Sequence, residues 1–267
     1  MDKASLVNRF ASSPEQRVLF AHILDLALRS KSKNIVVSGN FISEADAYIV
    51  SDMICAAGDY SFILFGGYPD AERKCPVFIP DYFNSDDILS EPSLADISFA
   101  EISVSKFDSD KAEFSHRDCL GALMALGIER EMIGDILTSG NSAIIILKTQ
   151  IADFVRENLN GIGRYKVSVI LSDKAEITKK EDFEFFSNTV ASMRLDGVIA
   201  SVFKLSRGGA AEAIERGLVT VNGVTTMKTD SNVSEGSRIS LRGKGRVIIE
   251  QVQGLSKKGR IRFIYKK

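Results

Sequence analysis

The chain has 267 residues, 45% of them apolar, and a formal net charge of −1 at pH 7, which predicts roughly two domains or three small ones and excludes a disordered chain. No apolar run reaches the length of a transmembrane helix, and the first ten residues lack the apolar core of a signal peptide, so we expect a cytoplasmic protein that does not contact a membrane. Three cysteines without a C-x-x-C pair, beside only two histidines, argue against a metal site and predict reduced thiols.

Residues 1–85 predict an N-terminal α/β domain. Helices are expected where apolar residues recur every three or four positions after a capping serine, and strands where short apolar runs lie between turns. The stretch Asn84–Pro92 is rich in Asp and Ser, so it predicts a linker or surface loop. In chain order the predicted elements are the helix Pro14–Ser30 capped by Ser13, the strand Asn34–Val37, a helix from Ser43 to Gly58, and the strands Tyr60–Phe65 and Val77–Ile79.

Residues 86–182 predict a second domain with the element order β-α-β-β-α-β, which is typical of ferredoxin-like and RNA-recognition folds. RNA-recognition modules stack bases on aromatic residues of the third strand, but the run Ala143–Leu147 contains none. This sheet is therefore not expected to bind single-stranded RNA in the usual way, and a purely structural role stays open. The predicted elements are Ala95–Val104, Arg117–Leu126, Ile133–Leu137, Ala143–Leu147, Ile151–Leu159 and Tyr165–Leu171.

Residues 183–267 predict a terminal domain that begins with a pair of helices. Apolar residues keep the spacing of one helix face from Leu195 to Val202, and Ser206 is suited to cap a second helix that ends at Gly217. Asn222-Gly223 predicts a type I′ hairpin turn, in which both residues need positive φ. The stretch Lys179–Phe186 is expected to be a helix or linker that leads into this domain, and the predicted strands are Val219–Val221, Arg238–Leu241, Val247–Val252 and Ile261–Tyr265.

Charge is distributed unevenly along the chain. From Arg194 onward there are 15 Lys and Arg against six Asp and Glu, a net charge of +9, whereas the preceding residues hold 19 bases and 29 acids, a net charge of −10. This asymmetry predicts a polyanionic partner for the terminal domain alone. It also argues against unselective coating of nucleic acid, because the acidic part repels phosphate.

The terminal domain carries one extended pattern of residues: Arg194-Leu195-Asp196, Ser206-Arg207, Ala210, Ile214, Gly217, Val219, Val221-Asn222-Gly223, Val233, Gly236 and Ile239. In this order and spacing the pattern resembles the S4 RNA-binding domain. The resemblance implies two helices and a small sheet that present a basic surface to structured RNA, with Ser206 and Arg207 at the start of the RNA-facing second helix. Gly208 and Gly209 depart from that family, which has better helix formers there. They indicate either local variation or a close approach of the backbone to a phosphate.

Motifs outside the terminal pattern make the resemblance more specific than the S4 domain alone. They are Gly66-Gly67-Tyr68 with Ala71-Glu72-Arg73-Lys74, the run from His116-Arg117-Asp118 to Ile133-Gly134-Asp135-Ile136, and Lys257-Lys258-Gly259-Arg260 in the tail. Together with the S4 pattern they resemble the YlmH family over nearly the whole chain. The resemblance implies binding to the large ribosomal subunit and a role in rescuing stalled translation, where the subunit still carries peptidyl-tRNA. An association with cell division also comes with that family.

Three motifs invite catalytic interpretations that the rest of the sequence does not support. His116-Arg117-Asp118 resembles part of a kinase loop but lacks the Asn and the glycine-rich loop that kinases need, so we predict that it caps a helix. Arg194-Leu195-Asp196 resembles the catalytic motif of pseudouridine synthases, but it lies inside the S4 pattern, and Asp196 is expected to bind a neighbouring amide or Arg. Gly161-x-Gly163 lacks the third glycine of a dinucleotide-binding fingerprint. Glu72-Arg73-Lys74 stays open between a solvated face and a partner contact.

We therefore predict a monomeric α+β protein that binds RNA without catalysing a reaction and needs no cofactor or metal. Its expected partners are large-subunit rRNA and peptidyl-tRNA. Two alternatives stay open, an RNA-modifying enzyme anchored by its S4 domain and an interaction scaffold for cell division. Arg207 is the strongest RNA-binding candidate, and the predicted surface further includes Arg194, Lys204, Ser206, Arg216, Lys228, Arg242, Lys244, Arg246, Lys257 and Lys258.

Overall fold

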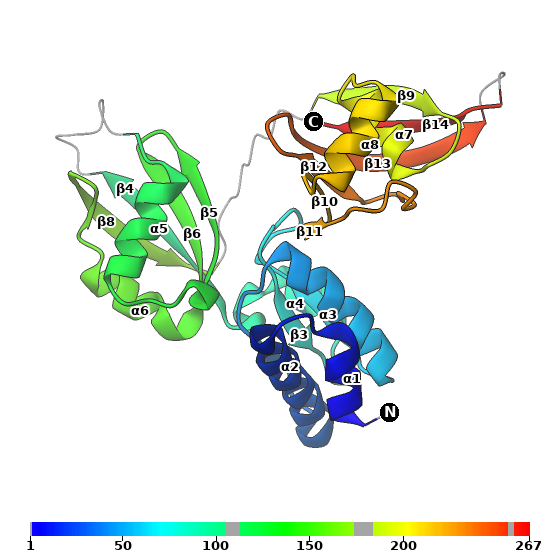
Figure 1. Cartoon of the computed structure of the whole chain (residues 1–267). Coiled ribbons are helices and arrows are strands. Elements are labelled where there is room, and N and C mark those ends of the chain that lie inside the picture. Colours follow the sequence, from blue (N-terminus) through cyan, green and yellow to red (C-terminus); the bar gives the residue numbers. More distant parts are fainter. Residues whose placement is uncertain (1, 105–112, 174–183, 256–258) are drawn as a thin grey trace. The chain divides into compact units, whose positions relative to one another are not determined.

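The computed structural model describes residues 2–104, 113–173, 184–255 and 259–267. The chain forms two compact units, Met1–Lys179 and Lys180–Lys267, and its described residues form a mixture of helices and three β-sheets (Figure 1). This mixture agrees with the predicted α+β class. None of the described helices combines the length and the apolar character that crossing a bilayer requires.

The first part of the N-terminal unit combines three helices with an antiparallel sheet in the order β1-β3-β2. Ser13 caps α2 and Ser43 caps α3, as predicted, while α1 follows Asp2 and was not predicted. The predicted strand Asn34–Val37 shares only Val37 with β1, because α2 continues to Lys33 and Asn34, with a φ of 53°, ends that helix in the left-handed region. The elements are α1 Lys3–Phe10, α2 Pro14–Lys33, β1 Val37–Ser38, α3 Glu44–Ala57, β2 Phe62–Phe65 and β3 Cys75–Phe78.

The prediction of a loop at Asn84–Pro92 was wrong. This stretch holds the helix α4 (Ser85–Ser90). Asn84 and Asp87 form a reciprocal capping box, in which each side chain accepts the backbone N–H of the other at 3.0 and 2.9 Å. Ile88 is fully buried and anchors the helix. The Asp and Ser residues that suggested a loop therefore serve the helix terminus instead.

The second part of the N-terminal unit is a five-stranded antiparallel sheet in the order β5-β6-β4-β8-β7, with two helices. Its elements follow one another as β-α-β-β-α-β, with the two-residue strand β7 added before the last strand. Ser115 caps α5 by accepting the Asp118 N–H, and the Asp118 carboxylate accepts the Ser115 N–H in return. Asp118 therefore has the predicted role at the helix start. His116 is the first helical residue and not the cap. The elements are η1 Pro92–Ala95, β4 Ile97–Val104, α5 His116–Ala125, η2 Arg130–Met132, β5 Ile133–Ser139, β6 Ser142–Lys148, α6 Thr149–Asn158, β7 Gly161–Ile162 and β8 Tyr165–Ser172.

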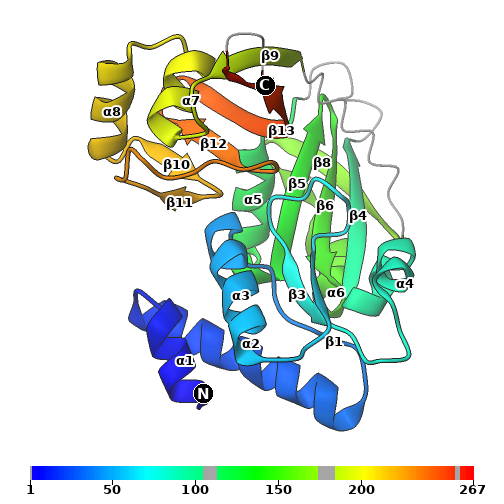
Figure 2. The ribbon, with the colours of Figure 1, turned by 90° about the vertical axis from the view of Figure 1, so that its right-hand side faces the viewer.

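Both faces of this five-stranded sheet carry a core. On one face, Ile145 of β6 packs with Leu123 of α5. On the other face, Phe99 of β4 and Ile146 of β6 share a core with Phe65 of β2, and Figure 2 shows the small sheet beside the larger one. Phe99 is 1% exposed and Ile146 is fully buried. The central part of the face on which RNA-recognition modules stack bases is therefore covered.

The C-terminal unit is a six-stranded antiparallel sheet in the order β11-β10-β12-β13-β14-β9, with α7 and α8 packed on one face. Asn222 and Gly223 have φ values of 51° and 77°, so the prediction of positive φ at both turn residues is confirmed. The second helix ends just before Gly217, which has a φ of 67°. The elements are α7 Leu195–Val202, α8 Arg207–Glu215, β9 Phe185–Val190, β10 Val219–Val221, β11 Val224–Thr225, β12 Arg238–Leu241, β13 Gly245–Leu255 and β14 Ile261–Lys266.

Strand β9 corrects the prediction of a helix or linker at Lys179–Phe186. Residues 179–183 lie outside the described residues, but Phe185 and Phe186 begin a strand. This strand pairs with β14, and Phe186 stacks on Tyr265 with 5.3 Å between the ring centroids. Because its partner comes from the other end of the unit, the pattern within this stretch could not reveal the pairing.

Candidate nucleic-acid interface

The start of α7 is organised around one buried carboxylate, that of Asp196, whose side chain is 7% exposed. Its oxygens accept hydrogen bonds from Arg194 Nε at 3.2 Å and from Arg207 Nε at 3.2 Å. They also accept the Gly197 N–H at 2.8 Å. The prediction that Asp196 binds a neighbouring amide or Arg is confirmed. The carboxylate thereby holds Arg207, from the next helix, beside Arg194.

The charges of this group favour an anionic partner. Burial by itself raises the pKa of Asp196, but the hydrogen bonds from Arg194, Gly197 and Arg207 outweigh burial and hold the pKa below its ordinary value. The carboxylate therefore stays ionised at neutral pH, and with the two arginines it leaves one net positive charge. The Arg194 and Arg207 side chains are 43% and 69% exposed, so both guanidinium groups remain accessible from solvent.

Three more predicted residues lie in the turn after α7 and in a loop that meets the start of α7. Lys204 is exposed in the turn between α7 and α8, where it adopts a φ of 54°. Ser206 caps α8, its Oγ accepting a first-turn N–H at 3.0 Å. Lys228 is exposed in a loop that meets α7, where the Asp196 N–H donates to the neighbouring Thr229 carbonyl at 3.0 Å. We call the following residues the α7 cluster: Arg194, Lys204, Ser206, Arg207 and Lys228.

A second group of predicted residues lies at the other end of α8. Arg216 follows the helix and pairs with Glu212 at 3.3 Å. The Arg242 N–H donates to the Leu218 carbonyl at 2.9 Å, which holds the β12–β13 turn against the segment after α8. Lys244 is exposed in that turn. Because α8 has nine residues, this group lies about 13 Å along the helix from Arg207.

The remaining predicted residues belong to neither group. Arg246 alternates along β13 with Val247, which lies in the core under the helices, so Arg246 projects from the opposite face of the sheet. Lys257 and Lys258 lie outside the described residues. The predicted surface is therefore divided between two groups beside the helices and one position on the other face.

Replacing Asp196 by Asn is expected to lower the free energy of unfolding by about 1–2 kcal/mol at pH 7, because its charged hydrogen bonds to the two arginines weaken. The folded pKa of Asp196 is depressed, so its contribution is full above about pH 5 and is lost as pH falls through that folded pKa, below about 4. Wild type and variant should therefore converge in acid. Urea unfolding at pH 7 and at about pH 3 measures both effects, and an undiminished difference in acid would contradict this role.

Gly208 and Gly209 do not prevent α8 from forming, since the helix begins at Arg207. A Cβ added at Gly208 would have no neighbour within 4 Å. Gly208→Ala is therefore expected to raise the free energy of unfolding by about 0.5–1 kcal/mol, which thermal unfolding measures. We expect the RNA affinity of this variant to equal that of the wild type, which is the outcome if the two glycines are only local sequence variation. A weaker affinity would instead indicate that the backbone closely approaches a phosphate.

A second buried carboxylate, which sequence reasoning missed, joins two motifs of the N-terminal unit. Asp135 is 9% exposed and accepts the Tyr68 hydroxyl at 2.7 Å, the Glu72 N–H at 2.7 Å and the Arg73 N–H at 3.0 Å. Tyr68 and Asp135 are 67 residues apart, so no spacing rule connects them. Their bond fastens the loop after β2 to strand β5.

From the sequence alone, the motif Glu72-Arg73-Lys74 stays open between a solvated face and a contact with a partner. The Arg73 side chain forms neither, because it binds groups within its own unit. Its guanidinium donates to the carbonyl oxygens of Phe41 at 2.9 Å and Ile133 at 3.0 Å, and burial lowers its pKa. Gly134 permits the close approach of Phe41 to β5, because a Cβ there would lie 2.8 Å from the Phe41 ring. Arg73 is thus a structural group that ties three segments of the unit together.

Lys148, at the end of β6, is also a structural group. It is 3% exposed, and its Nζ donates to Ser38 Oγ at 2.8 Å and to the carbonyls of Gly39 and Ala95 at 3.0 Å each. Burial lowers its pKa. Nearby, burial raises the pKa of Cys75 to about 12, so this cysteine is a protonated thiol at neutral pH.

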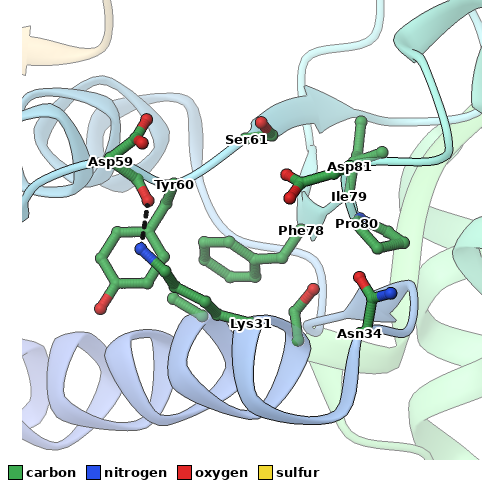
Figure 3. Close-up of a pocket in the computed structure, with 11 residues that line it drawn as sticks. Lys31, Asn34, Asp59, Tyr60, Ser61, Phe78, Ile79, Pro80 and Asp81 are labelled. Carbon is green, nitrogen blue, oxygen red and sulfur yellow. Dashed lines mark hydrogen bonds between the residues drawn. The ribbon is translucent and has the colours of Figure 1, made fainter.

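The N-terminal unit has a hollow of about 120 Å³, lined by α2, the segment before β2 and the end of β3 (Figure 3). Its lysine is already engaged: Lys31 Nζ donates to the Asp59 carbonyl at 3.1 Å and lies 5.3 Å from the centre of the Tyr60 ring. The lining contains neither His nor Cys. It therefore offers no imidazole or thiol for acid–base or nucleophilic catalysis.

Comparisons with known proteins agree with an RNA partner. A family model described as "Putative RNA-binding domain in YlmH" matches residues 92–176. The chain is 31% identical over 229 residues to ribosome-associated protein quality control protein P2 of Bacillus subtilis (strain 168), and this alignment covers 85% of the chain and 86% of that protein. A solved structure of "Cell division protein ylmH from Streptococcus pneumoniae" is 23% identical, covers 61% of this chain and 93% of that one, and superposes with a TM-score of 0.49.

Proposed function

Because this chain belongs to the YlmH family, we propose that it is a non-enzymatic factor that binds the large ribosomal subunit, contacts rRNA and peptidyl-tRNA, and acts in the quality control of stalled translation. The observation that carries the proposal is the α7 cluster, in which one buried carboxylate holds two exposed arginines side by side. The name of the Bacillus subtilis relative, a ribosome-associated quality control protein, supports the biological setting.

The proposed domains follow the predicted division into residues 1–85, 86–182 and 183–267. The strand order β5-β6-β4-β8, antiparallel throughout, supports a ferredoxin-like fold for the middle domain. The helix pair α7–α8 on the sheet that contains β10 and β12 supports an S4 domain at the C-terminus. We further propose that the protein is cytoplasmic and monomeric.

The α7 cluster is proposed as the main contact with RNA phosphates. Its guanidinium and ammonium groups would displace condensed counterions, which favours binding at low salt. Arg207 has the most exposed guanidinium of the pair, and the α8 N-terminus beside it adds a partial positive charge. The proposed surface continues along α8 to the second group, and its members are Arg216, Arg242 and Lys244, with Arg246, Lys257 and Lys258 as further contacts.

The chemistry of the α7 cluster supports binding rather than catalysis. Its acid, Asp196, is held by two arginines and an amide, and its depressed pKa makes it a poor general base near neutral pH. An RNA-modifying enzyme would need an activated base or nucleophile beside the bound RNA. The α7 cluster supplies cations and a capping serine whose hydroxyl is engaged with the helix backbone.

Residues 92–176 are proposed to contact RNA away from the centre of their sheet. Phe99 and Ile146 bury that centre against the small N-terminal sheet. This arrangement supports the prediction that the sheet does not stack bases in the way of an RNA-recognition module. On strand β8, Ile170 is 63% exposed and is accessible to a partner.

Crosslinking to RNA in cells, followed by mapping of the bound nucleotides, tests the proposed function. We expect crosslinks in large-subunit rRNA and in tRNA. Crosslinks scattered over messenger RNAs would contradict it. Pull-down with and without nuclease tests the cell-division alternative, because partners that survive RNA digestion would favour a protein scaffold.

A further inference from the structure

The sheet of the C-terminal unit has one face without helices. Side chains alternate between the two faces along each strand. Val247 and Phe263 lie in the core under α7 and α8, so their neighbours Ile248 and Arg262 project from the opposite face. Within the described part of this unit, both helices pack on the first side. We call the second side the open face.

Strand register aligns four residues in a row across the open face. Arg238 of β12 lies opposite Ile248 of β13. Ile248 lies opposite Lys266 of β14, and Lys266 lies opposite Phe185 of β9. Neighbouring strands are about 4.8 Å apart, so the row extends about 14 Å. It ends on the outermost strand at a phenylalanine that is 63% exposed.

The open face is basic. Along the described strands Glu250 is its one acid, and that carboxylate pairs with Lys266 at 3.2 Å. At its border, Arg260 donates to the Thr189 carbonyl at 2.9 Å, next to the position where Thr189 lies opposite Arg262. The described strands place four cations on this face, Arg238, Arg246, Arg262 and Lys266, against Glu250, and Arg260 lies at the border.

From this geometry we propose that the open face binds single-stranded RNA, with a base stacked on Phe185 and phosphates held by the exposed Arg246 and Arg262. Sites for single strands combine an aromatic platform with cations along an extended backbone, and they tolerate many sequences. The half-buried Ile248 and Ile264 between the cations provide apolar contacts for bases. A protein interface instead has few charges at its centre.

This proposal rests on the proposed function for the nature of the partner, but it uses the side of the sheet opposite the α7 cluster. Two separate RNA contacts on one small domain would let it hold folded RNA on one side and an unpaired strand on the other. The two contacts can be measured independently. Binding to ribosomal subunits reports on the α7 cluster, and binding to a short oligonucleotide reports on the open face.

Fluorescence anisotropy of the full-length protein with a labelled single-stranded RNA of about 12 nucleotides tests the proposal. Phe185→Ala is expected to weaken binding about tenfold, because a stacked base is lost. Arg262→Glu is expected to weaken it similarly and to reduce the slope of log affinity against log salt by about one. Matched controls are Phe154→Ala, at an aromatic that is 45% exposed on α6, and Arg29→Glu, at an exposed arginine on α2.

Both controls are expected to keep the oligonucleotide affinity of the wild type. Wild-type affinity in both Phe185→Ala and Arg262→Glu would overturn the proposal, as would an equal loss in Phe154→Ala or Arg29→Glu. If Phe185→Ala or Arg262→Glu lowers the unfolding temperature, Arg246→Glu replaces it as a test of the open face, with the same expected loss of oligonucleotide affinity. Binding of the same variants to large subunits is measured in parallel, so failure here leaves the proposed ribosomal function separately testable.

Discussion

Changing Lys204 and Arg207 together to Glu is expected to weaken binding to isolated large ribosomal subunits about 100-fold at about 100 mM salt. The change removes two cations from the α7 cluster and adds two anions that repel phosphate. If the wild type contacts about five phosphates, its affinity should fall by roughly two to three orders of magnitude between about 50 and 200 mM salt. The slope for the variant should be smaller by about two. Co-sedimentation with purified subunits across this salt range measures both quantities.

A control for this variant must match its change in net charge. Arg17→Glu with Arg29→Glu reverses two exposed charges on α2 in the N-terminal unit, and it is expected to leave co-sedimentation unchanged. Lys204→Gly adds a second check, because it removes one charge while suiting the left-handed backbone at this position. Unchanged co-sedimentation of the Lys204 and Arg207 double variant would rule out the α7 cluster as the ribosomal contact.

Replacing Asp135 by Asn is expected to lower the free energy of unfolding of the N-terminal unit by about 3 kcal/mol or more. The carboxylate accepts three hydrogen bonds, from the Tyr68 hydroxyl and from the N–H groups of Glu72 and Arg73. An amide of the same shape turns a donor toward at least one of these donors, and it removes the negative charge that faces Arg73. Urea unfolding followed by circular dichroism measures the loss.

The matching control for this effect is Asp153→Asn on α6. The Asp153 side chain is 75% exposed and pairs with Arg156 at 2.9 Å, so its replacement is expected to change stability by less than about 0.5 kcal/mol. Equal stability of the Asp135 and Asp153 variants would show that the buried hydrogen bonds are not needed. RNA binding by the C-terminal unit is expected to survive in both variants under native conditions.

The features that sequence reasoning placed correctly depend on residues close together in the chain. Ser13, Ser43 and Ser206 each cap a helix through an N–H only a few positions ahead. Asn222-Gly223 makes its turn because those two residues tolerate positive φ. The binding of Asp196 to the adjacent amide and to Arg194 is equally local.

By itself, therefore, the sequence determined the capping serines of α2, α3 and α8, the hairpin turn, the concentration of positive charge after Arg194 and the family to which the chain belongs. Only the tertiary structure decided which distant groups meet. It turned Phe185 and Phe186 into an edge strand against β14, joined Tyr68 to Asp135, and buried one face of the five-stranded sheet. Caps and turns arise from steric and hydrogen-bonding preferences within a few residues, whereas these contacts depend on how whole elements bury their apolar surface together.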